Sequence, residues 1–203
     1  LMKQDSTKEQ AEKEVSLSIE RLIYYAGWCD KFQQLYSTVN PVASSHFNFS
    51  APEPTGVVSI IAPQNNSLIG LVSVIAPIIA GGNTCVVLAS ASKPLCAVTF
   101  AEVLGTSDVP GGTINILTGK PGELLSWFSD HMDVNAIVFC ENDKEAILKI
   151  QQKATLNLKR VLLWNNYNWL LETAQNPYLI NDAQEIKTTW HPIENIGGAK
   201  AGY

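Results

Sequence analysis

The sequence predicts an α/β domain built on a doubly wound parallel sheet. Two observations lead to this class: short apolar runs recur along the chain, and stretches with a helical pattern lie between them. Apolar runs without polar alternation indicate strands that are buried on both faces, which is typical of parallel sheets. The five runs are GVVSIIAP (56–63), TCVVLA (84–89), TINILTG (113–119), NAIVFC (135–140) and RVLLW (160–164). The helical stretches are 67–80, 93–105, 121–130 and 142–155.

Composition sets the size of this unit and the partners it suits. The chain has 203 residues, of which 46% are hydrophobic and only 16% are charged, so it can bury the core of one domain with an appendage. Its net charge is -5, and its Lys and Arg residues are scattered. Nucleic-acid binding depends on clustered phosphate contacts, so the sequence favours small molecules or proteins as partners and excludes nucleic acid.

Two segments flank the predicted α/β unit. Residues 6–35 carry apolar residues at alternating spacings of four and three, which predicts an amphipathic helix that docks on the domain. These residues are Val15, Ile19, Leu22, Ala26 and Cys29. Residues 36–52 mix short β-type residues with Ser, Asn and Pro and predict a hairpin or extended arm. The predicted division is 1–52 for helix and arm, 53–172 for the α/β domain, and 173–203 for a tail with the strand IKTTWHPI (186–193).

Cysteine usage and apolar patterning bear on the compartment. Cys29, Cys85, Cys96 and Cys140 show no CxxC spacing, and three of them lie in apolar runs, so we predict reduced, structural thiols in a cytoplasmic protein. The most apolar stretch, residues 67–88, contains Pro77 and two consecutive glycines. These residues break it into helix, turn and strand, so no membrane segment is predicted.

In a doubly wound sheet, ligands bind beyond the carboxyl ends of the strands. The segments that follow the five predicted strands therefore hold the candidate site residues. They read APQNN (62–66), ASASKP (89–94), TGKPGE (118–123), CENDKE (140–145) and WNNYNW (164–169).

Five pieces of the chain carry a specific resemblance: EPTGVVSIIAPQNNSL (53–68), APIIAGGNTCVVLASASKPL (76–95), VPGGTINILTG (109–119), HMDVNAIVF (131–139) and NLKRVLL (157–163). In this order and spacing they resemble the cofactor-binding, Rossmann-like domain of the aldehyde dehydrogenase superfamily. YYAGWCDKF (24–32) is similar to the helix before the family's oligomerisation hairpin, and GGAKAGY (197–203) resembles its late GGxKxSGxG motif. Only a few residues lie between Glu172 and Gln184, where the family has its catalytic domain with the nucleophilic cysteine. This arrangement resembles the truncated second module of the family 16 aldehyde dehydrogenases.

The resemblance implies that the positions for cofactor binding have changed. The family's lysine and glutamate for the adenosine ribose correspond to Leu88 and Ala91, and the two glycines of its GSTxxG correspond to Glu141 and Ala146. Leucine forms no hydrogen bond, and a glutamate places negative charge where phosphates approach a helix N-terminus. An ordinary explanation is also open, because Glu141 and the polar residues after it suit the first turn of a helix.

The catalytic positions implied by the resemblance have also changed. Trp164 stands where the family has its general-base glutamate, and an indole cannot accept a proton at neutral pH. We expect Trp164 to cover the cleft or to pack against the tail. Asn65 matches the asparagine that donates to the family's oxyanion hole, but without a nucleophile it is interpreted as a retained turn residue.

Other chemistry is weakly represented. His46, His131 and His191 lie far apart in the sequence, so no metal site is predicted. Cys140 beside Glu141 is interpreted as a packing residue, and TGKPGE with Lys120 as a surface turn, because it is too short for a phosphate-binding loop.

These observations lead to two functional hypotheses. The first is a catalytically inactive aldehyde-dehydrogenase-like module that acts in oligomer assembly or scaffolding, with no expected cofactor. The alternative is part of an NAD(P)-dependent oxidoreductase that binds NAD or NADP weakly and needs another subunit or segment. The predicted partner is a second copy or a homologous aldehyde dehydrogenase module. The arm and the tail strand are expected to cover, within the chain or across a dimer, the sheet edge left by the absent domain.

Overall fold

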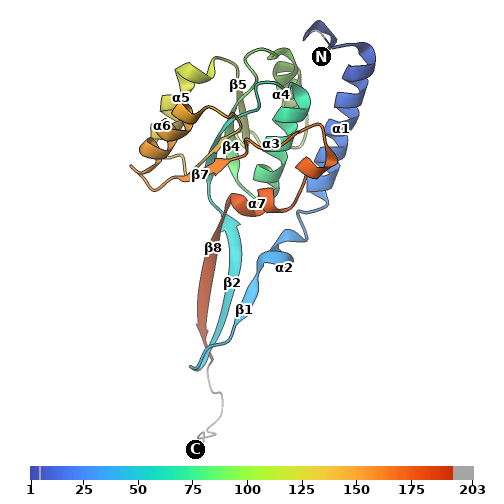
Figure 1. Ribbon diagram of the computed structural model, residues 1–203. Helices are drawn as coiled ribbons and strands as arrows, with labels where there is room; N and C mark the ends of the chain where they lie inside the picture. The colour runs from blue at the N-terminus through green and yellow to red at the C-terminus, as the bar shows by residue number, and fades with distance from the viewer. Residues whose placement is uncertain (5, 194–203) are drawn as a thin grey trace, which may run out of the picture.

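A five-stranded parallel sheet lies at the centre of the protein (Figure 1). The computed structural model describes residues 1–4 and 6–193. The strand order is β5-β4-β3-β6-β7, so the chain reverses direction across the sheet at β3, as in a doubly wound fold. The strands are β3 (Val57–Ile61), β4 (Thr84–Leu88), β5 (Ile114–Leu117), β6 (Ala136–Phe139) and β7 (Arg160–Leu163). The predicted fold class is therefore confirmed.

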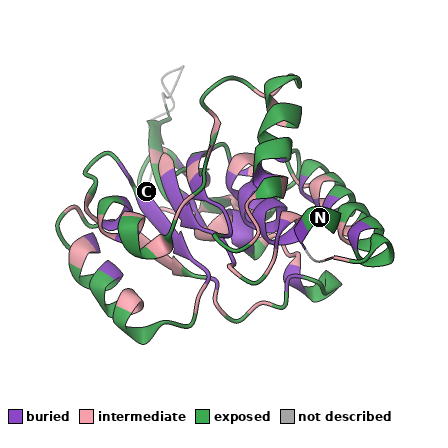
Figure 2. Ribbon diagram, turned by 90° about the horizontal axis from the view of Figure 1, so that it is seen from above, coloured by how far each residue is buried: buried purple, intermediate pink, exposed green. Residues whose placement is uncertain are grey.

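Helices cover both faces of the sheet (Figure 2). On one face, Val58 and Ile60 of β3 pack with α3 and α4 in the largest hydrophobic cluster. On the other face, Ile61 of β3 packs with Leu125 of α5 and Ile150 of α6. The four helices are α3 (Leu68–Ala80), α4 (Leu95–Gly105), α5 (Pro121–Asp130) and α6 (Lys144–Ala154), and each lies within two residues of its predicted range at either end. The apolar runs fit best at the central strands β3 and β6, which are buried on both faces, whereas the edge strands β5 and β7 are only partly buried.

The N-terminal helix α1 (Lys8–Ala26) packs against α3 (Figure 1). A capping box begins it: Thr7 Oγ1 accepts from the Gln10 N–H, and Gln10 Oε1 accepts from the Thr7 N–H. The single helix predicted over 6–35 is wrong in extent. The helix ends at Ala26, with Gly27 as its C-cap residue, and a separate short helix α2 (Phe32–Tyr36) follows after a turn.

The face of α1 that packs on the domain also differs from the prediction. Val15 and Ile19 are 39% and 52% exposed, and Ala26 and Cys29 are exposed as well, while Leu22 alone of the predicted face is partly buried. The buried residues are Ala11, Ser18, Arg21 and Tyr25. Small and hydrogen-bonding side chains fit against the tightly packed α3, so the packing face of α1 is not its most apolar face.

A three-stranded antiparallel sheet projects from the domain and is called the arm here (Figure 1). It consists of β1 (Thr38–Asn40), β2 (His46–Pro54) and β8 (Gln184–Pro192) in the order β1-β2-β8. In the register of β2 and β8, Ser50 lies opposite Thr188, and their hydroxyl oxygens are 2.8 Å apart. The tail strand β8 thus pairs with β2 of the arm. Within the described residues, neither segment covers an edge of the parallel sheet, so the expectation that they cover it within the chain is wrong. The GGAKAGY motif lies outside the described residues.

Residues between β7 and β8 return to the core before they enter the arm. They form the short helices η2 (Glu172–Ala174) and α7 (Tyr178–Asp182), and Leu179 and Ala183 join the largest hydrophobic cluster. Asn83 fixes this connection, because its side-chain amide donates to the Ala183 carbonyl at 3.0 Å and accepts from the Gly56 N–H at 2.9 Å. The start of the arm is therefore held at the amino ends of β3 and β4.

Candidate functional site

The carboxyl ends of β3, β4 and β6 are joined by hydrogen bonds centred on Gln64. The Gln64 N–H donates to Glu141 Oε1 at 2.7 Å, and Gln64 Oε1 accepts from the Ala91 N–H at 2.8 Å. The Gln64 carbonyl accepts from the hydroxyls of Ser90 and Ser92 at 2.7 and 3.1 Å. We call these contacts the Gln64 closure. They satisfy, within the chain, polar groups at the sheet edge where ligands bind in doubly wound folds.

The N-terminus of α6 is also satisfied by the chain itself. Asp143 Oδ1 accepts from the N–H groups of Glu145 and Ala146 at 3.0 and 3.1 Å, so Asp143 is the N-cap. The side chain of Ala146 packs against the hydrophobic cluster under α5 and α6. A carboxylate at this end of the helix interacts favourably with the macrodipole and occupies the place that an anion would take.

Leu88 and Ala91 stand at the two positions where the family binds the adenosine ribose, and they lie in different environments. Leu88 is fully buried in the core between the sheet and α5. Ala91 is exposed and takes part only through its backbone N–H, which donates to Gln64. The structure does not bring the side chains of these two positions together at the surface.

Trp164 follows β7 and points into the protein. It is 3% exposed, belongs to the largest hydrophobic cluster together with Trp169, and donates from Nε1 to Asp182 Oδ2 of α7 at 3.0 Å. Of the two expectations for Trp164, packing against the tail is the one observed. Burial raises the pKa of Asp182, while the bond from Trp164 and the charge of Arg160 act in the opposite direction.

Asn65 is exposed in a polar pocket of about 460 Å³ between α1 and the start of α3. Glu14 of α1 also lines this pocket, and its Oε1 accepts from the Ile69 N–H at 3.0 Å. This contact caps α3, because Ser67 at the N-cap makes no side-chain bond of its own to the helix. Neither Glu141 nor Trp164 lines this pocket, although Glu141 accepts from the N–H of Gln64, the residue before Asn65.

Arg21 was not singled out in the sequence, yet it fastens the segment after Trp164. Its guanidinium is buried and donates to Ser73 Oγ at 2.8 Å and to the carbonyls of Trp169 and Leu171 at 3.3 and 3.2 Å. Burial lowers the pKa of Arg21. A basic residue in the middle of an amphipathic helix carries no sequence signal for such a role, since it usually faces solvent.

The remaining candidate residues do not assemble into a site. Cys140 is buried, and burial raises the pKa of its thiol well above the ordinary value, with the nearby Glu141 acting in the same direction. Lys120 is exposed at the start of α5. His131 follows α5, while His46 and His191 lie in the arm. Among residues 1–4 and 6–193, no three His, Cys, Asp or Glu side chains gather as a metal site would require, and no helix is long and apolar enough to span a membrane.

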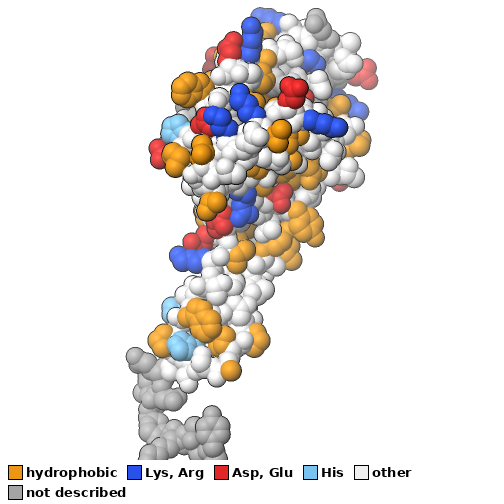
Figure 3. Space-filling model, turned by 60° about the vertical axis from the view of Figure 1, so that its left-hand side comes forward, with side chains coloured by type: hydrophobic (Ala, Val, Ile, Leu, Met, Phe, Trp, Pro, Cys, Tyr) orange, Lys and Arg blue, Asp and Glu red, His pale blue; other side chains and the backbone are white. Residues whose placement is uncertain are grey.

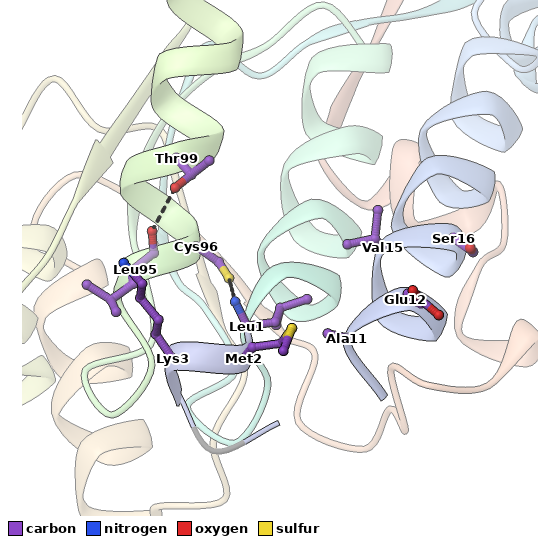
Figure 4. A pocket seen from close by; sticks show the side chains of 10 residues that line it. All are labelled: Leu1, Met2, Lys3, Ala11, Glu12, Val15, Ser16, Leu95, Cys96 and Thr99. Carbon is purple, nitrogen blue, oxygen red and sulfur yellow. Dashed lines mark hydrogen bonds between the residues drawn. The ribbon is translucent and has the colours of Figure 1, made fainter. Parts of the chain in front are cut away.

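A larger groove, of about 670 Å³, lies between α1 and α4 and contains no predicted site residue (Figure 4). At its floor the N-terminal ammonium of Leu1 donates to Cys96 Sγ at 3.3 Å, and the backbone N–H of Leu95 donates to Gln4 Oε1 at 2.7 Å. The first residues of the chain therefore fasten the N-terminus of α4. The groove is lined by Leu1, Met2, Lys3, Ala11, Glu12, Val15, Ser16, Leu95, Cys96 and Thr99.

Known proteins resemble this chain in both sequence and structure. It is 35% identical over 150 residues to the cytosolic 10-formyltetrahydrofolate dehydrogenase of Xenopus tropicalis, a match that covers 73% of this chain and 17% of the relative. It is 33% identical over 155 residues to the putative aldehyde dehydrogenase DhaS of Bacillus subtilis, covering 76% of this chain and 30% of the relative.

Two solved structures have the same fold over 74% of this chain and 30% of their own length. One is PnpE from Pseudomonas sp. WBC-3, with a TM-score of 0.68 and 28% identity. The other is an aldehyde dehydrogenase from Bacillus cereus in complex with NAD+, with a TM-score of 0.68 and 25% identity. The chain thus spans less than a third of the length of these relatives. Because the model of the aldehyde dehydrogenase family matches residues 2–166, the chain belongs to that family.

Proposed function

We propose that this chain is a catalytically inactive aldehyde-dehydrogenase-like module that acts in oligomer assembly or scaffolding. The observation that carries the proposal is the Gln64 closure, in which Glu141 accepts from the Gln64 N–H at 2.7 Å. The Glu141 carboxylate thus makes a contact within the chain at the edge of the sheet where a ligand would otherwise bind. A dinucleotide that entered here would first have to break the closure and then face the negative charge of Glu141.

The residues present do not fit an NAD or NADP pyrophosphate at this edge. Phosphates bind well where free N–H groups and a helix N-terminus point at them. At α6 these N–H groups already bind Asp143, whose carboxylate repels an anion. The side chain of Leu88 is in the core, and Ala91 has no polar side chain to meet a ribose. Trp164 offers a donor that is already bound to Asp182.

The arm supports the assembly part of the proposal. Within the described residues β1 and β8 each pair on one side only, so both edges of the arm have free backbone groups. Hydrophobic and histidine side chains gather on the arm (Figure 3). Val39 and Phe47 are 66% and 48% exposed and line an apolar depression of about 390 Å³. Such a surface suits a second copy or a homologous aldehyde dehydrogenase module. We also propose a cytoplasmic location, in accord with four free cysteines.

The first experiment is a calorimetric titration of NAD and of NADP into the purified chain. We expect no heat of binding up to millimolar nucleotide and no shift of the thermal midpoint. The aldehyde dehydrogenase from Bacillus cereus, whose structure holds NAD+, serves as the positive control. Binding at micromolar affinity would overturn the inactive-module proposal.

The second experiment measures assembly by sedimentation at several concentrations. We expect a homodimer at tens of micromolar and its loss in the variant Phe47→Ser, which removes an exposed ring from the arm. Leu158→Ser is the matched control, because Leu158 is 91% exposed on the α/β domain and away from the arm. A monomer at all concentrations, or equal effects of the two variants, would contradict assembly through the arm.

A second candidate function is weak NAD(P) binding as part of an active oxidoreductase. It is favoured by the structural likeness to the Bacillus cereus enzyme in complex with NAD+. The candidate requires the Gln64 closure to open, so the variant Glu141→Gly should then bind nucleotide more tightly than the natural chain. Equal absence of binding in both proteins would speak against it.

A further inference from the structure

An apolar pocket of about 260 Å³ lies under α5 on the side of the sheet away from α3. Its floor is formed by the amino-terminal half of β3 and by β4, whereas the Gln64 closure lies at the carboxyl ends of the same strands. The pocket is lined by Val57, Ser59, Val86, Trp127, Phe128, His131, Asp133 and Val134. The pocket is therefore separate from the candidate residues at the carboxyl ends of the strands.

The turn that forms one wall of this pocket is held rigidly. Lys159 is 6% exposed, and its Nζ donates to the carbonyls of His131 and Val134 at 2.7 and 2.6 Å. Asn157 Nδ2 donates to the carbonyls of Met132 and Val134, both at 3.1 Å. These four bonds fix the turn whether or not anything fills the pocket. A preformed cavity of this kind costs a ligand little ordering free energy.

The chemistry of the walls selects a particular class of ligand. Trp127 is 70% exposed at the pocket, an unusual position for the largest aromatic side chain, and its ring offers a flat apolar and π surface. Asp133 is the only lining residue with a formal charge when His131 is neutral, and it is exposed at the rim. A carboxylate and an exposed indole that line the same pocket are suited to an ammonium group through ion pairing and cation–π attraction.

We infer that this pocket binds a small aromatic amine, with one or two fused rings between Trp127 and the floor of β3 and β4 and its ammonium group at Asp133. The volume admits a ligand of that size and excludes a dinucleotide, which needs a larger site. Within the pocket, Ser59 is the only hydroxyl among the lining residues, and it lies in the buried floor. This inference does not rest on the proposed function, since it concerns the opposite end of the strands.

The test is a titration of the full chain with three probes that share one ring system: tryptamine, indole and indole-3-acetate. Two-dimensional NMR follows the indole N–H signal of Trp127, which is assigned by its disappearance in Trp127→Phe. We expect tryptamine to bind about two- to fivefold more tightly than indole, as one exposed cation–π and ion-pair contact allows, and indole-3-acetate to bind most weakly.

Two variants separate the contributions of the pocket. Asp133→Asn should abolish the advantage of tryptamine over indole without weakening indole, because only the charge is removed. Trp127→Ala should weaken all three probes and leave the fold intact, since the ring is largely exposed. The inference is overturned if no probe shifts the Trp127 signal at several millimolar, if the three probes bind equally, or if Asp133→Asn leaves their order unchanged. These readouts do not involve NAD, so their failure and that of the proposed function are distinguishable.

Discussion

At the residue scale, the side chain of Trp164 makes one polar contact and otherwise lies in the largest hydrophobic cluster. Its Nε1 donates to Asp182 Oδ2 at 3.0 Å, and both groups lie where the chain after β7 meets α7. The raised pKa of Asp182 means that the folded protein binds this proton more readily than the unfolded chain does. The contribution of Asp182 to stability is therefore present in acid and is lost as the pH rises through the folded pKa.

The substitution Trp164→Phe tests this contact. It removes the bond that lowers the pKa of Asp182, so that pKa should rise further. It should cost about 1 kcal/mol of unfolding free energy at neutral pH, because a partly buried carboxylate loses its donor. The cost should be smaller in mild acid, where the carboxyl is protonated. Urea unfolding at both pH values and NMR titration of Asp182 measure these effects. A pH-independent cost would mean that only packing was lost.

Thiol reactivity provides a second test at the residue scale. Burial raises the pKa of Cys85 to about 12 and raises that of Cys140 as well, so neither forms thiolate at neutral pH. Cys29 is exposed. We expect Cys29 to react first with a thiol reagent in the native protein, and Cys85 and Cys140 to react only after unfolding. Mass mapping of the labelled residues checks the order, and rapid labelling of Cys140 would indicate an accessible site there.

At the scale of elements, α1 shows that the apolar face of a helix and its packed face are not always the same. Arg21 and Tyr25 bury polar groups and satisfy them, since Tyr25 Oη donates to the Asn176 carbonyl at 3.3 Å and Arg21 donates to three acceptors. Val15 and Ile19 remain exposed. Burial of a polar group costs little when every donor has a partner.

Substitutions on the two faces of α1 should therefore differ in effect. The double variant Val15→Ser, Ile19→Ser should change the free energy of unfolding by less than about 1 kcal/mol, because both side chains stay in contact with solvent. Tyr25→Ala, at a residue that is 1% exposed, should cost about 3–5 kcal/mol through the cavity that it leaves. Chemical denaturation of the three proteins gives the comparison. A large loss of unfolding free energy in the double variant would mean that Val15 and Ile19 are covered in solution.

At the scale of the whole molecule, the core and the arm differ in how they are stabilised. The three hydrophobic clusters contain residues of the parallel sheet and of the helices around it, but none of β1, β2 or β8. The arm is held mainly by its own ladder and by polar contacts, such as Asn40 Nδ2 donating to Ser50 Oγ at 2.9 Å. An element with few buried apolar contacts opens locally at a lower free energy.

Hydrogen exchange of the intact chain should reveal this difference. Amides of β3 and β6, in the middle of the parallel sheet, should exchange only through global unfolding, and those of the arm should exchange much faster at low protein concentration. If two copies join through the arm, protection of β2 and β8 should increase with concentration while β3 is unchanged. If the amides of the arm were as protected as those of β3 in a dilute monomer, the arm would not open at a lower free energy than the core, and the prediction would be wrong.

The sequence by itself determined the parallel sheet, its covering helices and the family. A strand such as Val57–Ile61 that is buried on both faces must be apolar along its whole length, so its type is encoded locally. The positions of Leu88, Ala91, Glu141 and Trp164 could be named in the same way, as departures from a family pattern.

Tertiary structure alone decided what those positions contact. Gln64 and Glu141 are 77 positions apart, and nothing local to either residue shows that the strand order places their loops side by side. The same holds for Arg21, which reaches carbonyls about 150 positions away, and for the tail strand, which pairs with β2. Hydrogen bonds between distant segments depend on how the elements are arranged in space, whereas burial of a strand on both faces is recorded in its own residues.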